Sequence, residues 1–193
     1  MGALVILITG ALTGIGRATA LAFAKEGATV VVSGRREVEG KALEHEIRSL
    51  GAEAAFILAD VRHEDDVRNL VQQTVGRFGR LDVAVNNAGT EGKPGSLTEQ
   101  TSDSYAGMFD TNVLGTLLSL KHELRVMQPQ GSGSIINISS TMGERGERIS
   151  RFTPQASTRW KVSQNPPLSK PPPSASTSMQ SRLVPPRPRC SIV

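Results

Sequence analysis

The sequence predicts an α/β fold in which a doubly wound parallel sheet lies between two layers of helices. Short apolar runs rich in Val, Ile and Ala alternate with longer stretches in which apolar residues recur at helical spacing. The runs are nearly continuous, as in strands buried on both faces of a parallel sheet. Strands that alternate with helices are joined by right-handed crossovers, and 193 residues suffice for one such domain with a core.

Each expected element follows from its own residue pattern. β-branched residues dominate the second apolar run, as in a strand. In the first helical stretch, Ala18, Leu21, Ala22 and Lys25 recur at helical spacing, and Gly27 ends the helix. The expected strands are Ala3–Ile8, Ala28–Ser33, Ala54–Leu58, Asp82–Asn86 and Ser134–Ser139, and the expected helices are Ile15–Glu26, Glu37–Leu50, Glu64–Phe78 and Ser104–Met127.

A glycine-rich turn, Thr9-Gly10-Ala11-Leu12-Thr13-Gly14-Ile15-Gly16, joins the first strand to the first helix. Gly10 permits the tight turn, Gly14 lets backbone approach a pyrophosphate, and Gly16 lets the helix pack closely. The free N–H groups and the dipole of the helix N-terminus favour an anion. This order of strand, glycine turn and helix predicts dinucleotide binding, and the alternative is an ordinary strand–helix turn.

Charge and cysteine content divide the chain at residue 150. All 18 acidic residues precede position 151, so residues 1–150 carry 15 basic against 18 acidic side chains, a net charge of −3. Residues 151–193 hold seven basic residues, no acid and nine of the eleven prolines, which predicts a basic, Pro-rich, disordered tail. A single cysteine and a first apolar run too short for a signal peptide favour a cytoplasmic protein without a membrane span.

Two arginines follow the second expected strand, where sheets that bind NAD usually carry an acid for the ribose 2′-hydroxyl. Arg35 and Arg36 stand there, and no acid comes before Glu37. An arginine at this place can pair with a 2′-phosphate, which favours NADP over NAD. Arg17, just after the glycine turn, points the same way more weakly. The alternative is a solvated charge pair at a helix start.

The spacing of the glycine turn, TGxxxGIG, resembles the cofactor turn of the short-chain dehydrogenase/reductase family, and further family motifs follow in order to about Ser150. The resemblance implies a Rossmann-like sheet of order 3-2-1-4-5 in a domain spanning residues 1–150. It also implies a nicotinamide cofactor, a small carbonyl or alcohol substrate and a homo-oligomer. The cofactor residues that it implies are Gly10, Thr13, Gly14, Ile15, Gly16, Arg35, Asp60, Val61, Asn87, Ala88 and Gly89.

The resemblance assigns a role to several of these residues. Asp60 and Val61 would hold the adenine ring, although an Asp after a strand is equally a helix cap. The family's NNAG motif, Asn86-Asn87-Ala88-Gly89, would tie the sheet together and line the ribose. Asn112 would distort its helix and hold a water that relays protons. Ser140, or its neighbour Ser139, would hydrogen-bond the substrate carbonyl.

The family's general acid/base pair, a Tyr followed four residues later by a Lys, is missing. The sole tyrosine is Tyr105, where the family has a packing aromatic. Read from the third base of each codon, Trp160-Lys161 encodes Glu and Met179-Gln180 encodes Ala whatever the synonymous codons. With GC-rich codons the region after Arg151 reads VYTASKHAVEG, which contains YxxxK. We interpret this as a one-base frameshift near Ser150, which leaves a truncated fold, an impaired oligomer and an inactive chain.

Two other functional classes are alternatives to an oxidoreductase. A non-catalytic dinucleotide-binding protein could recruit a partner through the Pro-rich tail, which is able to form a polyproline helix. A translated pseudogene would have no function. The three histidines, His45, His63 and His122, lack metal-ligand spacing, so no metal site is predicted, and no nucleic acid is expected as a partner.

Overall fold

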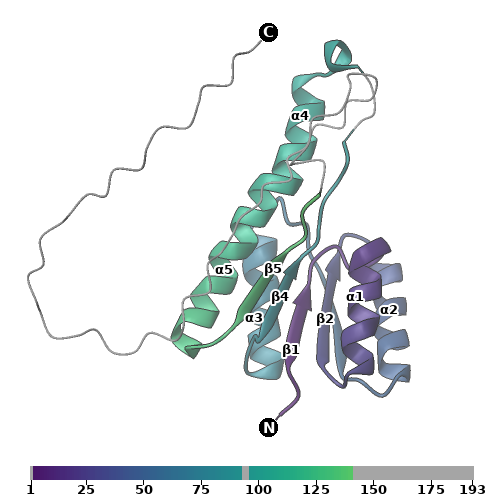
Figure 1. Ribbon diagram of the computed structural model, residues 1–193, viewed down its shortest axis with the longest axis vertical. Helices are drawn as coiled ribbons and strands as arrows, with labels where there is room; N and C mark the ends of the chain where they lie inside the picture. The colour runs from purple at the N-terminus through teal and green to yellow at the C-terminus, as the bar shows by residue number, and fades with distance from the viewer. Residues whose placement is uncertain (1, 93–95, 141–193) are drawn as a thin grey trace, which may run out of the picture.

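The computed structural model describes residues 2–92 and 96–140, and within them a parallel sheet lies between two layers of helices (Figure 1). The strand order β3-β2-β1-β4-β5 confirms the predicted doubly wound α/β fold. The strands are β1 (Val5–Ile8), β2 (Thr29–Gly34), β3 (Ala54–Leu58), β4 (Val83–Asn86) and β5 (Ser134–Asn137). The helices are α1 (Gly14–Lys25), α2 (Glu37–Ser49), α3 (Glu64–Phe78), η1 (Leu97–Glu99), α4 (Ser102–Phe109), η2 (Asp110–Leu114) and α5 (Gly115–Gln130).

Alternating strand residues feed two separate cores, one on each face of the sheet. Ile6 and Ile8 of β1 belong to the core under α1 and α2, whereas Leu7 faces α3 and α5. Figure 1 shows this division, with α1 and α2 on one side of the sheet and α3 and α5 on the other. Both faces of β1 are therefore buried, which is why its sequence is apolar without alternation.

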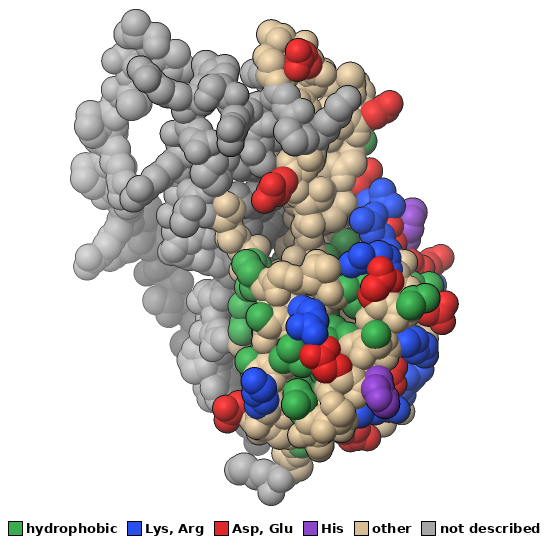
Figure 2. All heavy atoms as spheres, turned by 90° about the vertical axis from the view of Figure 1, so that its right-hand side faces the viewer, with side chains coloured by type: hydrophobic (Ala, Val, Ile, Leu, Met, Phe, Trp, Pro, Cys, Tyr) green, Lys and Arg blue, Asp and Glu red, His purple; other side chains and the backbone are tan. Residues whose placement is uncertain are grey.

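The face that α1 buries differs from the one marked by Ala18 and Ala22, which are exposed. The buried residues are Gly16, Ala20 and Ala24, all small. Small side chains let a helix lie close to a sheet. α1 therefore packs on the sheet through its face of smallest side chains and not through its most apolar face. Its outer surface, together with that of α2, carries interspersed basic and acidic side chains (Figure 2), including the Arg17–Glu46 ion pair at 2.6 Å.

The long helix expected over 104–127 extends at both ends and is interrupted in the middle. α4 starts at a capping box in which Thr101 and Ser104 satisfy each other's backbone N–H groups. The segment η2 is π-helical and contains Asn112, so the helix is distorted at the residue for which the resemblance implies distortion. α5 then runs to Gly131, whose left-handed backbone (φ +73°) ends it.

β5 lies at the edge of the sheet formed by the described residues, where it pairs with β4. Ile136 and Ile138 are 42% and 41% exposed there, so the edge of the described sheet is apolar. The predictions made for residues 151–193 lie outside the described residues. Within the described part, no helix is both long and apolar enough to cross a membrane.

We expect Gly40→Ala to destabilise the fold. Gly40 faces β3 from α2, and a Cβ there would overlap the ring of Phe56. Overpacking of this kind costs about 1–3 kcal/mol, which exceeds the gain of about 1 kcal/mol in helix propensity. Gly76→Ala on α3 is the matched control, since a Cβ there meets nothing within 4 Å. Urea unfolding should show Gly40→Ala less stable and Gly76→Ala more stable, and a stabilised Gly40→Ala variant would contradict this packing.

Candidate functional site

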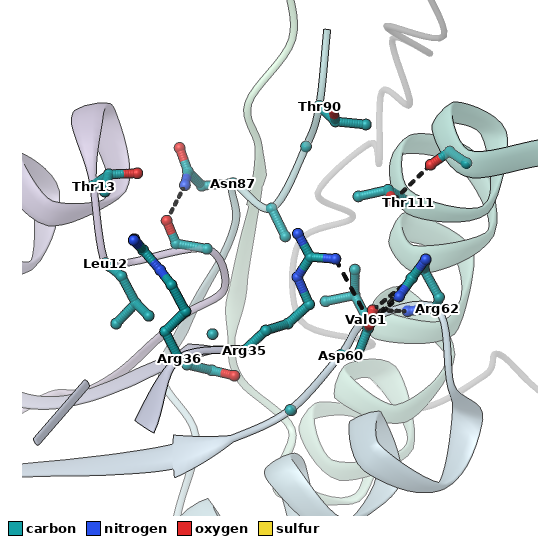
Figure 3. Close-up of a pocket in the computed structure, with 17 residues that line it drawn as sticks. Leu12, Thr13, Arg35, Arg36, Asp60, Val61, Arg62, Asn87, Thr90 and Thr111 are labelled. Atoms are coloured by element: carbon teal, nitrogen blue, oxygen red, sulfur yellow. Dashed lines mark hydrogen bonds and ion pairs between the residues drawn. The ribbon is translucent and has the colours of Figure 1, made fainter. Parts of the chain in front are cut away.

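A cleft of about 350 Å³ opens at the carboxyl ends of the strands, beside the junction of β1 and β4 (Figure 3). In an open parallel sheet this edge, at the point where the strand order reverses, is the usual place for a ligand. Eight of the predicted cofactor residues line the cleft: Gly10, Thr13, Arg35, Asp60, Val61, Asn87, Ala88 and Gly89.

The glycine turn shapes one wall of this cleft. Gly10 has φ +63°, and a Cβ there would lie 2.7 Å from the Cα of Ala88, so the position has no room for a side chain. Gly14 has φ +56° and opens α1, and nothing lies within 4 Å of a Cβ built on it. The Thr13 side chain makes no cap hydrogen bond, and the first turn of α1 holds no acid. The helix N-terminus is therefore left uncapped beside open space, an arrangement that suits an anion.

Asn87 ties the glycine turn to the end of β4. Its Nδ2 donates to the carbonyl oxygens of Thr9 (3.1 Å) and Gly10 (2.9 Å). In return, Thr9 Oγ1 accepts from the backbone N–H groups of Asn87 and Ala88, both at 3.2 Å. A Cβ at Gly16 would overlap the Asn87 amide and lie 2.6 Å from the Gly10 oxygen. The predicted close packing at Gly16 is thus packing against this clamp.

Asp60 sits at the far end of the cleft between two arginines (Figure 3). Arg62 binds both carboxylate oxygens through Nε, each at 3.0 Å, and its backbone N–H donates to Oδ1 at 3.1 Å. Arg35 lies farther away, with 3.9 Å between Nη1 and Oδ2. The hydrogen bonds from Arg62 lower the pKa of Asp60, whose side chain is only 15% exposed.

The other arginines near the glycine turn differ in what they face. Arg36 lines the cleft and pairs with Glu39 of α2 at 3.0 Å. Arg17 lies outside the set of residues that line the cleft, because its guanidinium binds Glu46 on α2. In this structure the charge of Arg17 is matched across the α1–α2 contact, so its suggested part in cofactor selection stays a prediction.

A second hollow of about 310 Å³ shares one wall with the cleft, since Asn87, Ala88 and Gly89 line both. Ile15, Asn112 and Ser140, which are distant in sequence, meet around this second hollow. Ser139 lines it as well, so the structure leaves the choice between the two serines open. Asn86 and Asn137, the polar residues that end β4 and β5, also line it, and the remaining lining residues are Thr90, Glu91, Thr116 and Ile138.

The Asn112 side chain is engaged by the backbone of Thr90. Asn112 Nδ2 donates to the Thr90 carbonyl and Oδ1 accepts from its N–H, both at 2.8 Å. The Asn112 carbonyl accepts from Thr116 Oγ1, also at 2.8 Å. The π-helical turn thus presents the Asn112 side chain to the segment that follows β4 and holds both together.

Two charged residues of the site region were missed by the sequence reasoning. Arg62 is two residues beyond Asp60. Its only signal in the sequence is that a basic residue follows the acid within the same turn. Glu123 lies on the buried face of α5 and is 1% exposed. Its Oε2 accepts from Asn86 Nδ2 at 3.0 Å, and burial raises its pKa to about 7. Glu123 follows Leu120 by three residues and precedes Met127 by four, so the helical period did mark it as inward.

The histidine that α5 buries contacts an acid of α3. His122 is 5% exposed, and its Nε2 lies 3.1 Å from Glu64 Oε1, which also accepts from Lys121 at 2.6 Å. Within the described residues, no group of His, Cys, Asp and Glu side chains is placed to hold a metal ion.

Comparison with known proteins places this geometry in a family. The family model for short chain dehydrogenases matches residues 4–152. The 3beta-hydroxysteroid dehydrogenase of Mediterraneibacter gnavus is 41% identical over 142 residues, which are 74% of this chain and 51% of that protein. The chain thus spans about half the length of the curated relatives that it matches.

Two solved structures with bound cofactors superpose on this chain with the same TM-score. A crystal structure of actinorhodin polyketide ketoreductase with NADPH superposes on this chain with a TM-score of 0.73 at 36% identity. The match covers 76% of this chain and 57% of the ketoreductase chain. NAD+-bound xylitol dehydrogenase gives 0.73 at 34% identity, with 76% and 56% covered. The strand order, the glycine turn and the Asn87 clamp agree with these matches. The chain is therefore a member of the short-chain dehydrogenase family.

Proposed function

We propose that this chain forms the cofactor-binding part of an oxidoreductase that transfers hydride between NADPH and a small carbonyl or alcohol substrate. The observation that carries the proposal is the pair Arg35 and Arg36 beside an uncapped helix N-terminus in one cleft. Because the chain spans only about half of its relatives, the activity, substrate and assembly of the whole protein belong to the proposal too.

The residues present fit a dinucleotide. The turn at Gly10 would be filled by any Cβ, and the space beside Gly14 is open at the N-terminus of α1, where a pyrophosphate would gain the free N–H groups. Thr13 and Ile15 flank that space, and Asn87, Ala88 and Gly89 would line the ribose. Asp60 and Val61 stand at the far end of the cleft, where the adenine ring would lie.

NADP suits the charges of this cleft better than NAD. The side chain of Arg35 is 67% exposed and is held only loosely by Asp60, so its guanidinium is available to a 2′-phosphate. The NAD alternative requires an acid to accept from a ribose hydroxyl, and β2 ends without one. Both an NADPH-bound and an NAD+-bound relative resemble the chain, so the preference depends on these side chains and not on the fold.

The second hollow would receive the nicotinamide and the substrate. A bound nicotinamide dinucleotide supplies the hydride chemistry. Ser140 would donate a hydrogen bond to the substrate carbonyl, and Asn112 would keep the segment after β4 in place and hold the relay water. The chain has no Tyr followed four residues later by Lys, and Tyr105 is 57% exposed and stacked on Phe109, which fits a packing role.

The alternative is a non-catalytic dinucleotide-binding protein whose Pro-rich tail recruits a partner, and its discriminating feature is the reading frame after Ser150. Resequencing of the coding DNA across codons 145–160 separates the two. One base fewer would restore YxxxK and support a full reductase. An unchanged sequence would support binding without turnover, and a tail-dependent partner in a pull-down would then favour the alternative.

We expect Arg35→Ala to weaken NADPH binding by roughly ten- to a hundredfold, since a hydrogen bond between charged groups contributes about 1.5–3 kcal/mol. NADH affinity should change little. Titration of cofactor fluorescence measures both dissociation constants. Arg77→Ala, an exposed arginine on α3 that bonds Gln73, is the control and should alter neither. Equal losses for NADPH and NADH in Arg35→Ala would contradict a 2′-phosphate contact, and no NADPH binding by the unmodified chain would overturn the proposal.

The chain as written should bind NADPH but not turn it over. Loss of a general acid/base removes roughly 10²–10⁴ in rate, and here the proton donor and its lysine partner are both missing. The measurement is the decrease in NADPH absorbance with a panel of ketones and aldehydes. Turnover at about 1 s⁻¹ or faster, the ordinary range for enzymes, would contradict this expectation.

We expect Arg62→Ala to lower stability at neutral pH and to leave it unchanged in acid. Arg62 lowers the pKa of Asp60, so the stabilisation is present above the unfolded pKa of about 4 and is lost as the pH falls through the lower folded value. Arg62 is partly exposed, so the difference at pH 7 should be about 1 kcal/mol or less. Urea unfolding at pH 7 and pH 3 tests this against Arg68→Ala, which removes an exposed pair with Asp65. An equal loss at both pH values would show that Arg62 acts by packing alone.

A further inference from the structure

Glu123 is a buried acid that has no basic partner among the described residues, and it contacts Asn86, which lines the second hollow. Its side chain is 1% exposed, and the two influences on its pKa are burial, which dominates, and a hydrogen bond from Asn86. Burial raises that pKa, the Asn86 hydrogen bond lowers it by less, and the result is a pKa of about 7. A carboxyl group in such a place is favoured as the neutral acid because burial disfavours its charged form.

In the described part of the chain, the hydrogen bonds around Asn86 leave one buried acceptor of its amide unfilled. Asn86 Nδ2 donates to Glu123 Oε2 and to Asn137 Oδ1, both at 3.0 Å. Asn86 Oδ1 is buried and has no hydrogen-bond partner among the described residues. An ionised Glu123 would add only acceptors to this cluster, whereas the neutral acid adds one O–H donor. Unpaired buried acceptors are costly, so the cluster itself favours a proton on Glu123.

We propose that Glu123 is a positioning residue for the nicotinamide half of the site: as a neutral carboxylic acid it fixes the Asn86 amide, which in turn holds Asn137 beside β4. The naming of that half rests on the function proposed above. Asn86 directly precedes the Asn87 clamp, and Asn137 comes three residues before Ser140, so both ends of the second hollow depend on this amide.

Charged groups on the neighbouring elements are engaged elsewhere. On α5 and α3, Lys121 and His122 both contact Glu64, and Arg68 pairs with Asp65. Just before β4, Asp82 precedes Asn86 by four residues and pairs with Arg80. The strand β5 contains no ionisable side chain. The hydrogen bonds of Asn86 and Asn137 therefore depend on the protonation state of Glu123.

The first experiment compares the pH dependence of unfolding of the full chain with that of Glu123→Gln. Between about pH 4.5 and 7 the folded chain keeps a proton on Glu123 that the unfolded chain has lost. Stability attributable to Glu123 is therefore present at low pH and falls as the pH rises through this window. We compare the unfolding constants of the two chains as a ratio, unmodified over Glu123→Gln. This ratio should rise by up to about tenfold per pH unit between about pH 4.5 and 7, and it should stay constant above about pH 7.

Glu26→Gln, which removes an exposed carboxylate on α1, is the matched control and should follow the unmodified chain. The side-chain amide signals of Asn86 and Asn137 should move with a midpoint near pH 7 in the unmodified chain and stay fixed in Glu123→Gln. Parallel unfolding curves, or amide signals that do not titrate, would overturn the proposal.

The second experiment separates positioning from general stability by ligand halves. Adenosine 2′,5′-bisphosphate fills only the adenosine half, whereas NADP+ also reaches the second hollow. Glu123→Leu, which removes the acceptor of Asn86, should weaken NADP+ at least fivefold and leave the bisphosphate unchanged, while Glu123→Gln should retain both affinities. Equal losses, or none, in Glu123→Leu would overturn the positioning role. If the unmodified chain bound neither ligand, the proposed function would fail, and the pH comparison and amide signals would still decide the role of Glu123.

Discussion

The site depends on one side-chain amide, that of Asn87, which joins the ends of β1 and β4. The register between these strands ends at the pair Ile8–Val85, so the regular ladder stops where the glycine turn begins. Asn87 Nδ2 replaces the missing ladder bonds by donating to the Thr9 and Gly10 carbonyls, and Thr9 Oγ1 accepts two backbone N–H groups in exchange. Without this exchange, four backbone groups next to the cleft would need water. The clamp therefore keeps the wall of the cleft fixed.

The charges of the adenosine half are balanced against one another around Asp60. Arg62 holds both carboxylate oxygens, while Arg35 is 3.9 Å away and largely exposed. A phosphate near Arg35 would compete with a weak partner, whereas an adenine contact to Asp60 would have to share a carboxylate that Arg62 already holds. Under the proposed function, selectivity at this end of the cleft would therefore depend on which arginine Asp60 retains and not on the fold.

The strands and helices could be predicted from local patterns, whereas the strand order and most of the residues that line the cleft came from the family resemblance. Buried strands read as apolar runs, and the glycine turn has a strict spacing, so Gly10, Asn87 and Asp60 were brought together as expected. The ion pair of Arg17 could not be foreseen, because its partner, Glu46, is 29 residues away on another helix. The buried face of α1 was missed because it consists of Gly16, Ala20 and Ala24, which an apolar count undervalues. The helical spacing marks Glu123 as inward but does not reveal its partner, Asn86, which is 37 residues away. Arg62 is only two residues from Asp60, but its bonds to that carboxylate depend on the turn between them.

The two halves of the site differ in how much of the chain they require. The adenosine half is built from β1, β2, β3, the end of β4 and the loops that follow these strands, with Gly107 and Thr111 of the long helix at its border. The second hollow requires the ends of β4 and β5, the π-helical turn at Asn112 and the serines after Asn137. Its support includes a buried acid, and its edge strand exposes Ile136 and Ile138. A change after β5 would therefore leave cofactor recognition largely intact while removing turnover, so the two properties have to be measured separately in this chain.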